Sequence, residues 1–303
     1  MRILLLFLDG IGLGPYDPET NPFAVADMPF LTQLTNGKRW LEGIGRQQSD
    51  LVSFVPTDPR LGVEGRPQSG TSQAVILTGK NVPEMIGRHY GPKPDAETRQ
   101  LLDNENLFIS VKADGKKAAL LDGYPPSLLA SIKRGKTLPS SIQYAAIASG
   151  QSLFTVDDVR EKRALTAEYT GQEWHSHLKL MDTPLYTPYE AGKMLVDLSE
   201  KYDFSLHSHW ITDYVGHRGP FQAAIELLER FDGVMRGIVD QWNPDEGLVI
   251  VTSDHGNMEV IGDRHHTEND VPTLIYGKEH AAFADGFSDL THITPRILRF
   301  LAK

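Results

Sequence analysis

Aspartate and histidine recur together in the carboxyl-terminal third of this 303-residue chain, in a pattern that could bind metal ions. The sequences are Asp-Tyr-Val-Gly-His at 213–217, Asp-His-Gly-Asn at 254–257 and His-Thr-Glu-Asn at 266–269. Near the amino terminus, an apolar run also ends in a carboxylate, Asp9. Gathering several carboxylates and imidazoles in one place is costly unless a cation neutralises them. The sequence therefore predicts a metal site.

The residue types and their spacing indicate the chemistry of such a site. Asp213 and His217 are four residues apart, so a turn can aim both at one ion. Asp254 and His255 are adjacent, so they point in different directions and can serve different ions. Asp and His together suit Mn²⁺ or Zn²⁺. Two such ions side by side would clamp the attacking and leaving oxygens of a phosphoryl transfer. Each motif alone has an ordinary structural reading, and their combination favours the metal site.

Hydroxyl groups gather at the start of a predicted helix, in Pro-Gln-Ser-Gly-Thr-Ser-Gln at 67–73. Backbone N–H groups and the helix dipole at such a point favour an anion such as phosphate. A metal ion there could lower the pKa of a hydroxyl and make it a nucleophile. The ordinary alternative is a serine or threonine that only caps the helix.

Predicted strands and helices alternate on both sides of a weakly patterned segment. Strands are expected at 3–8, 51–55, 117–121, 203–211, 247–252 and 272–276, and helices at 27–35, 68–77, 95–113, 188–201, 220–240 and 291–301. This alternation predicts a mainly parallel sheet with helices on both faces. Ligands of such sheets bind beyond the carboxyl ends of the strands, where Asp9, Asp213 and Asp254 would lie. Residues 126–186 are interpreted as a small inserted cap, and 1–125 with 187–303 as the core.

Composition excludes several kinds of function. The chain has no cysteine, which excludes disulfides, thiolate catalysis and cysteine-bound zinc. Its net charge of −10 argues against sequence-independent binding of nucleic acid. No apolar run has the length of a membrane span, and the amino terminus lacks the apolar stretch of a signal peptide. We therefore expect a cytoplasmic protein with no nucleic-acid or membrane partner, while the sequence does not indicate its oligomeric state.

Taken in order, the motifs resemble those of the alkaline phosphatase superfamily of metalloenzymes. The similarity is greatest to the branch that holds cofactor-independent phosphoglycerate mutase and phosphopentomutase. The features in common are a strand that ends in Asp-Gly, a Ser or Thr nucleophile, Asp-x-x-Gly-His, Asp-His-Gly-Asn and His-Thr-x-Asn, and they cover roughly residues 1–90 and 200–275. The resemblance implies an α/β three-layer sandwich with a mainly parallel central sheet of the alkaline phosphatase type.

The resemblance also implies roles for individual residues. Two divalent metal ions, Mn²⁺ or Zn²⁺, are expected. One ion is assigned to Asp213, His217 and His266, with His265 as the alternative to His266. The other is assigned to Asp9, Asp254, His255 and the nucleophile. Ser69 is the expected nucleophile, because it stands ten residues before Gly79, as in the superfamily, whereas Thr71 and Ser72 do not fit that spacing.

The leading functional prediction is hydrolysis of a small phosphate ester through a phosphoserine intermediate. A phosphomutase is the first alternative, although Ser72 and Gln73 stand where the mutases usually have Gly-His, and the cap is shorter than theirs. A non-catalytic, metal-stabilised binding protein is the second. Candidate contacts for the substrate are Arg66, Arg88 and His89. His207 and His209 share strand parity with Asp213 and could line the edge of the site, but buried core imidazoles are the favoured interpretation.

Overall fold

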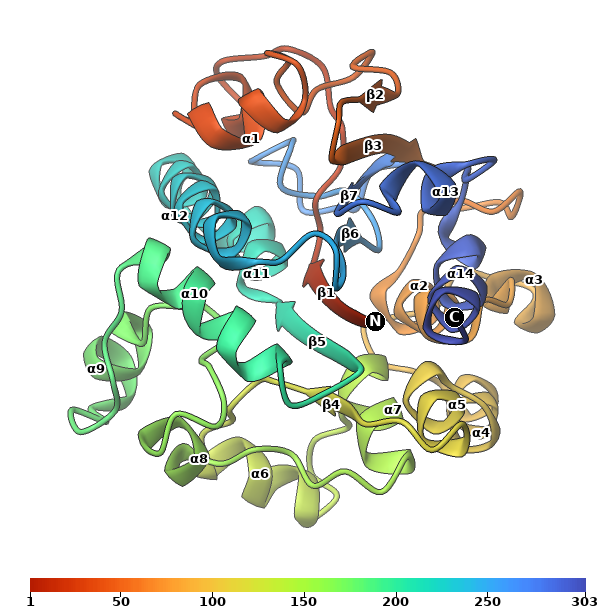
Figure 1. The fold of residues 1–303 in the computed structure, drawn as a ribbon, viewed down its shortest axis with the longest axis vertical. Coiled ribbons are helices and arrows are strands. Elements are labelled where there is room, and N and C mark those ends of the chain that lie inside the picture. Colours follow the sequence, from red (N-terminus) through yellow and green to blue (C-terminus); the bar gives the residue numbers. More distant parts are fainter.

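The computed structural model describes all residues 1–303 and is built around one seven-stranded sheet, in the order β2-β3-β7-β6-β1-β5-β4 (Figure 1). The strands are β1 (Arg2–Leu8), β2 (Gln47–Gln48), β3 (Val52–Thr57), β4 (Ala118–Leu120), β5 (Phe204–His209), β6 (Gly247–Ser253) and β7 (Val271–Tyr276). β1 pairs in parallel with both β5 and β6, and β5 pairs in parallel with β4. Only β2 and β7 run against the common direction. The predicted α/β sandwich with a mainly parallel central sheet is confirmed.

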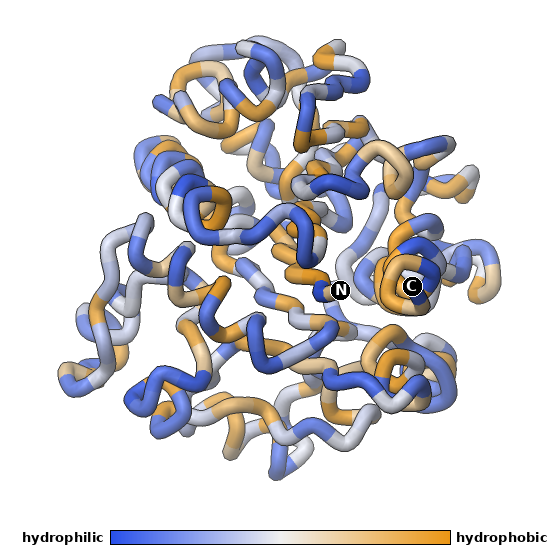
Figure 2. Tube along the Cα trace, viewed as in Figure 1, coloured by the Kyte–Doolittle hydropathy of each residue, from blue (hydrophilic) through white to orange (hydrophobic).

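Helices cover both faces of this sheet, and β1 contributes side chains to each (Figure 1). On the first face lie α1 (Pro29–Leu34), α10 (Pro188–Ser199), α11 (Ile211–Arg218) and α12 (Phe221–Gln241), with the short helix η1 (Pro22–Ala24). On the second lie α2 (Ser69–Thr78), α3 (Val82–Ile86), α4 (Ala96–Asn104), α5 (Leu107–Ala113), α13 (His280–Ala284), η2 (Leu290–His292) and α14 (Ile293–Leu301). Leu4 and Leu6 of β1 pack on the first face, while Ile3 and Leu5 pack on the second. Such burial on both faces explains why β1 is hydrophobic along its length (Figure 2).

Close contact between α10 and α12 depends on glycine. A Cβ at Gly192 of α10 would lie 2.1 Å from the carbonyl oxygen of Val234. A Cβ at Gly237 of α12 would lie 2.0 Å from the carbonyl oxygen of Tyr189. Any larger residue at either position would force the two helices apart. The closely packed α10 and α12 cover the same face of the sheet as α11.

Two predicted elements differ from the structure. Residues 95–113 form two helices rather than one, because the Asn106 side chain accepts a hydrogen bond from the N–H of Ile109 at 3.1 Å and starts a new helix there. The strand predicted at 203–211 ends at His209, and the helix α11 follows at once. Asp213 and His217 therefore lie on a helix and not in an extended loop.

The segment 126–186 is helical and sits beside β4 (Figure 1). Its helices are α6 (Pro126–Lys133), α7 (Ser141–Ala148), α8 (Val156–Arg160) and α9 (Gln172–Leu178). α7 packs against α2 and α4, and it buries Ile142, Ala145 and Ala146 in the core of the second face. Another part of the segment has a small hydrophobic cluster of its own, which includes Val156 and Trp174. The division of the chain into core and cap thus stays a prediction. No helix of the chain is long and apolar enough to cross a membrane.

Candidate metal centre

Three adjacent parallel strands deliver the predicted metal ligands to one edge of the sheet. Leu8 of β1 pairs in register with His209 of β5 and with Ser253 of β6, so the three strands end at the same level. Asp9 follows β1 directly, Asp254 follows β6, and α11 follows β5 after Trp210. The carboxyl ends of parallel strands are the usual place for a ligand in such a sheet. The strand register therefore explains how residues far apart in the sequence meet.

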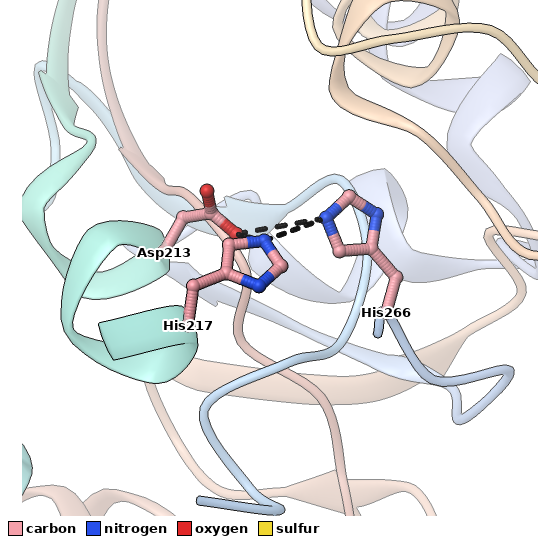
Figure 3. Close-up of side chains that lie close together, drawn as sticks. All are labelled: Asp213, His217 and His266. Atoms are coloured by element: carbon pink, nitrogen blue, oxygen red, sulfur yellow. Dashed lines mark hydrogen bonds and ion pairs between the residues drawn. The ribbon is translucent and has the colours of Figure 1, made fainter. Parts of the chain in front are cut away.

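Asp213, His217 and His266 form the first group of possible ligands (Figure 3). His217 Nε2 lies 3.3 Å from Asp213 Oδ1 and 3.2 Å from His266 Nε2. His266 Nε2 lies 3.8 Å from Asp213 Oδ1. Donor atoms at such separations can reach one ion at metal–ligand distances of about 2.0–2.2 Å. His266 Nδ1 donates to the carbonyl oxygen of Pro67 at 2.8 Å, which leaves the Nε2 lone pair free for a metal.

Asp9, Asp213 and His255 form a second group, which shares Asp213 with the first. His255 Nε2 lies 3.5 Å from Asp9 Oδ1 and 3.5 Å from Asp254 Oδ2. Asp9 Oδ1 is buried and has no hydrogen-bond donor, so this oxygen lacks the partner that a buried carboxylate requires. The Gln73 side chain donates to the other oxygen of Asp9 at 3.3 Å and bridges it to Asp254. A cation would satisfy the orphaned oxygen.

The three aspartates titrate far from their ordinary values. Burial, together with the nearby charge of Asp254, raises the pKa of Asp9 well above its usual range. Burial and the charge of Asp213 raise the pKa of Asp254 to about 7. Burial also opposes ionisation of Asp213, but the hydrogen bond from His217 and the neighbouring imidazoles lower its pKa to about 2. Two buried carboxylates and the half-buried Asp213, which repel one another, form an environment that a divalent cation relieves.

Ser69 faces this cluster from the first turn of α2. Its Oγ lies 2.9 Å from His255 Nε2, and the residue is almost completely buried. Thr71 is directed elsewhere, since its Oγ1 donates to the carbonyl oxygen of Gln68 at 3.2 Å and accepts from the N–H of Tyr90. Of Ser69 and Thr71, Ser69 is therefore the hydroxyl residue beside the possible metal ligands.

The buried carboxylate of Glu259 was not predicted from the sequence, and it connects the loops of the site. Glu259 accepts hydrogen bonds from the N–H of Gly12 at 3.0 Å and the N–H of Asn257 at 2.8 Å. It also accepts from the Thr267 hydroxyl and from the Asn269 side chain. The Thr and Asn of the His-Thr-x-Asn motif thus hold a carboxylate. The sequence did contain a signal for this residue, because a charged side chain between Met258 and Val260, next to a metal motif, indicates a buried polar contact.

A cavity of about 730 Å³ opens above the cluster. Its lining shows which of the predicted substrate contacts lie at the site. Arg66 lines this cavity, with Asp9, Ser69 and Asp213. Arg88 and His89 are not part of the lining. Arg88 pairs with Asp95 at 2.9 Å, and the ring of His89 contacts the carbonyl oxygen of Val63 at 3.3 Å. Of the three predicted residues, only Arg66 is brought to the site.

Other basic side chains line the same cavity: Lys93, Arg218, Arg264 and His265, of which only His265 was named from the sequence, as the alternative to His266. Burial lowers the pKa of Lys93, while the charge of Asp9 acts in the opposite direction. The positions of Lys93 and Arg264 depend on loops that meet only in the folded chain, so no local pattern could have identified these two residues. Arg218 was the exception, because it follows His217 directly.

Comparison with known proteins places this geometry in context. Residues 183–302 match the model of the metalloenzyme superfamily, so divalent metal ions are the implied cofactors. The 2,3-bisphosphoglycerate-independent phosphoglycerate mutase of Thiobacillus denitrificans is 34% identical over 110 residues, which are 34% of this chain and 21% of the mutase. The mutase of that name from Mycoplasma genitalium is 34% identical over 113 residues, 35% of this chain and 22% of the mutase. The match spans only about a fifth of each relative.

Solved structures resemble the chain over its whole length. The PH0037 protein of Pyrococcus horikoshii has a TM-score of 0.56 at 17% identity, with coverage of 99% of this chain and 96% of that protein. A cold-active alkaline phosphatase from Shewanella sp. has a TM-score of 0.51 at 14% identity, with both chains fully covered. At these identities the likeness concerns the fold alone. The predicted resemblance is confirmed in these terms: residues 183–302 match the metalloenzyme superfamily in sequence, and the whole chain shares the fold of an alkaline phosphatase.

Proposed function

We propose that this protein transfers phosphoryl groups from a small phosphate ester to water, with Ser69 as the nucleophile. The observation that carries the proposal is the position of Ser69 Oγ, 2.9 Å from His255 Nε2, beside buried aspartates and at the start of α2. A nucleophile there would meet the phosphorus where backbone N–H groups and metal ligands converge.

Two divalent ions, Mn²⁺ or Zn²⁺, are part of the proposal. Asp213, His217 and His266 would hold one, and Asp9, Asp254, His255 and Ser69 would hold the other. The unpartnered oxygen of Asp9 and the raised pKa of Asp254 support this fit. When bound, the ions would supply positive charge to the serine hydroxyl and to the transferred phosphoryl group.

The residues of the chain would carry out two displacements. In the first, a bond forms between Ser69 Oγ and phosphorus as the ester P–O bond breaks, and the proton lost by Ser69 is balanced by the one that the leaving oxygen gains. In the second, water attacks the phosphoserine, which restores Ser69 and releases inorganic phosphate. Lys93 and Arg66 line the cavity and would hold the phosphate oxygens.

Residues 126–186 would form the substrate side of the site, in keeping with the proposed cap. Leu128, Thr137, Ser140 and Gln143 all come from this segment and line the cavity. Because α7 is part of the core, its role is best tested by replacing these side chains rather than by deleting the segment. A change of substrate preference with unchanged metal binding would support the assignment.

A phosphomutase is the second candidate, since the relatives that match about a third of this chain are named phosphoglycerate mutases. The two activities differ in where the phosphate goes. The metal-free protein, reconstituted with Mn²⁺ or Zn²⁺, is therefore given phosphate monoesters, and both free phosphate and isomerised ester are measured. If the ester is isomerised and no free phosphate is released, the protein is a phosphomutase and not a hydrolase. Bound metal without either product would leave a non-catalytic binding protein.

The matched variants are Ser69→Ala and Thr71→Ser. Loss of the covalent step should lower turnover in Ser69→Ala by roughly 10³-fold or more. Thr71→Ser keeps a hydroxyl for its contacts with Gln68 and Tyr90, so its turnover should stay near that of the parent. A Ser69→Ala protein with full activity would rule out the serine nucleophile.

A further inference from the structure

Two large aromatic side chains are exposed on the helix that carries metal-ligand candidates. Trp210 and Tyr214 are 46% and 54% exposed, and both line the cavity above Ser69. Trp210, Asp213, Tyr214 and His217 follow the spacing i, i+3, i+4 and i+7, which places them on one side of α11. The aromatic pair and the two possible ligands thus face the same space.

Packing does not account for this exposure. The chain has four tryptophans, and the other three, Trp40, Trp174 and Trp242, are all buried. An exposed aromatic residue is ordinary when it stands alone. Two of them on the wall of one cavity, next to reactive groups, offer flat apolar surface to whatever enters.

The same cavity also contains an excess of positive charge outside the metal cluster. Arg66, Lys93, Arg218 and Arg264 line it, and none of them forms an ion pair with a carboxylate of the chain. In a protein with a net charge of −10, four cations without an ion-pair partner on one cavity wall favour an anionic ligand. The lining therefore combines recognition of an anion with recognition of a flat ring.

We propose that the substrate is a phosphate ester that carries a planar aromatic base, of the nucleoside monophosphate class. This inference rests on the proposed function, because the phosphate is placed at Ser69. The base would stack on Trp210 and Tyr214, within about one helical turn, or 5.4 Å along the axis, of Asp213, and the sugar would span that interval. A small aliphatic ester would fill the cationic part and leave both rings in water.

The experiment compares kcat/KM for adenosine 5′-monophosphate and glycerol 2-phosphate in the metal-reconstituted protein. The nucleotide should be preferred. Trp210→Ala should lower kcat/KM for the nucleotide roughly 10-fold, as expected for the loss of one stacked base, and leave glycerol 2-phosphate nearly unchanged. Trp210→Phe keeps a ring and should restore most of the preference. Tyr16→Ala is the matched control, since Tyr16 is 67% exposed and lies outside the cavity.

A binding measurement separates this inference from the proposed function. Adenosine monophosphate should quench the fluorescence of Trp210 in a metal-loaded Ser69→Ala protein, and the quenching should vanish when Trp210→Phe is added. If no ester is turned over, the proposed function fails, and this titration alone decides the inference. If the parent and the Trp210→Ala protein both turn over the two esters with equal kcat/KM, the inference is overturned, while the proposed phosphoryl transfer still holds. A Trp210→Ala change that only converts a dimer to a monomer would overturn it as well.

Discussion

The molecule holds two clusters of aspartate and histidine near the carboxyl ends of its central strands, and they differ in charge and in access to solvent. We call the first the metal-facing cluster, comprising Asp9, Asp213, His217, Asp254, His255 and His266. We call the second the sealed cluster, comprising Asp122, Tyr169, His207 and His209. Only three residues of sequence lie between His209 and Asp213. The comparison teaches that residue type and spacing do not by themselves decide which cluster can do chemistry.

The sealed cluster has one carboxylate, and the protein itself satisfies it. Asp122 accepts from the N–H of Ser208 at 2.9 Å and from the Tyr124 hydroxyl at 3.1 Å, and it lies 2.7 Å from His207 Nδ1. His209 Nδ1 donates to the carbonyl oxygen of Ala167. The ring of Tyr169 covers both imidazoles, with ring centroids 4.9 and 4.7 Å away. Neither histidine lines the cavity.

The metal-facing cluster differs in charge and in access. Three carboxylates lie close together, and several members of the cluster line an open cavity. The repulsion among its three carboxylates favours the binding of a cation, whereas the single hydrogen-bonded carboxylate of the sealed cluster does not. This contrast can be tested by exchanging single groups on each side.

The largest effect is expected from Asp213→Asn. Asp213 is a proposed ligand of the first ion and also lies within reach of Asp9 and His255 of the second, so the loss of its charge should weaken the binding of both ions. We expect turnover to fall by roughly 10³-fold or more, and thermal stabilisation by added Mn²⁺ to disappear. The counterpart in the sealed cluster is His207→Asn, which should lower stability but leave metal-dependent stabilisation in place. Equal metal responses in the two variants would contradict the distinction.

A smaller effect is expected from Glu259→Gln. The amide keeps the shape of the side chain but loses one acceptor oxygen, so it cannot receive all the hydrogen bonds from Gly12, Asn257 and Asn269. Metal affinity should fall roughly 10- to 100-fold, as is typical when a group that orients metal ligands is changed. Titration calorimetry with Mn²⁺ measures the change. Glu268→Gln is the control, because Glu268 is exposed in the same loop. If the Glu259→Gln protein binds Mn²⁺ as tightly as the Glu268→Gln protein does, Glu259 does not position the metal ligands.

The sequence predicted much of the core and several residues of the candidate site, because these depend on local patterns. The apolar run before Asp9 predicts a buried strand, and a carboxylate at its end lies at the ligand-binding edge of any parallel sheet. The break at Asn106 and the early end of β5 were missed, because a side-chain cap and the immediate start of α11 override apolar periodicity. Lys93 and Glu259 were missed because their roles depend on which loops meet. His207 and His209 were favoured as core imidazoles, and the structure buries both completely.

The smallest effect tests the sealed cluster by pH. Burial lowers the pKa of His209 to about 3, so the native state keeps this imidazole neutral down to that pH. In the unfolded chain its pKa returns to about 6.5, and below that pH the unfolded state takes up a proton that the native state does not. Stability from this group is therefore complete above about pH 6.5 and falls by roughly 1.4 kcal/mol per pH unit as the pH drops towards 3, which amounts to roughly 2 kcal/mol at pH 5.

His209→Asn removes this titration, so the stability difference between the parent and the variant should shrink by roughly 2 kcal/mol between pH 8 and pH 5. Urea unfolding of the metal-free proteins measures it, and the titrations of His255 and His266 cancel because both proteins contain them. If the parent and His209→Asn lose stability in parallel from pH 8 to pH 5, His209 is protonated in the native state. The sealed cluster would then carry a charged histidine, and the two clusters would differ only in their access to the cavity.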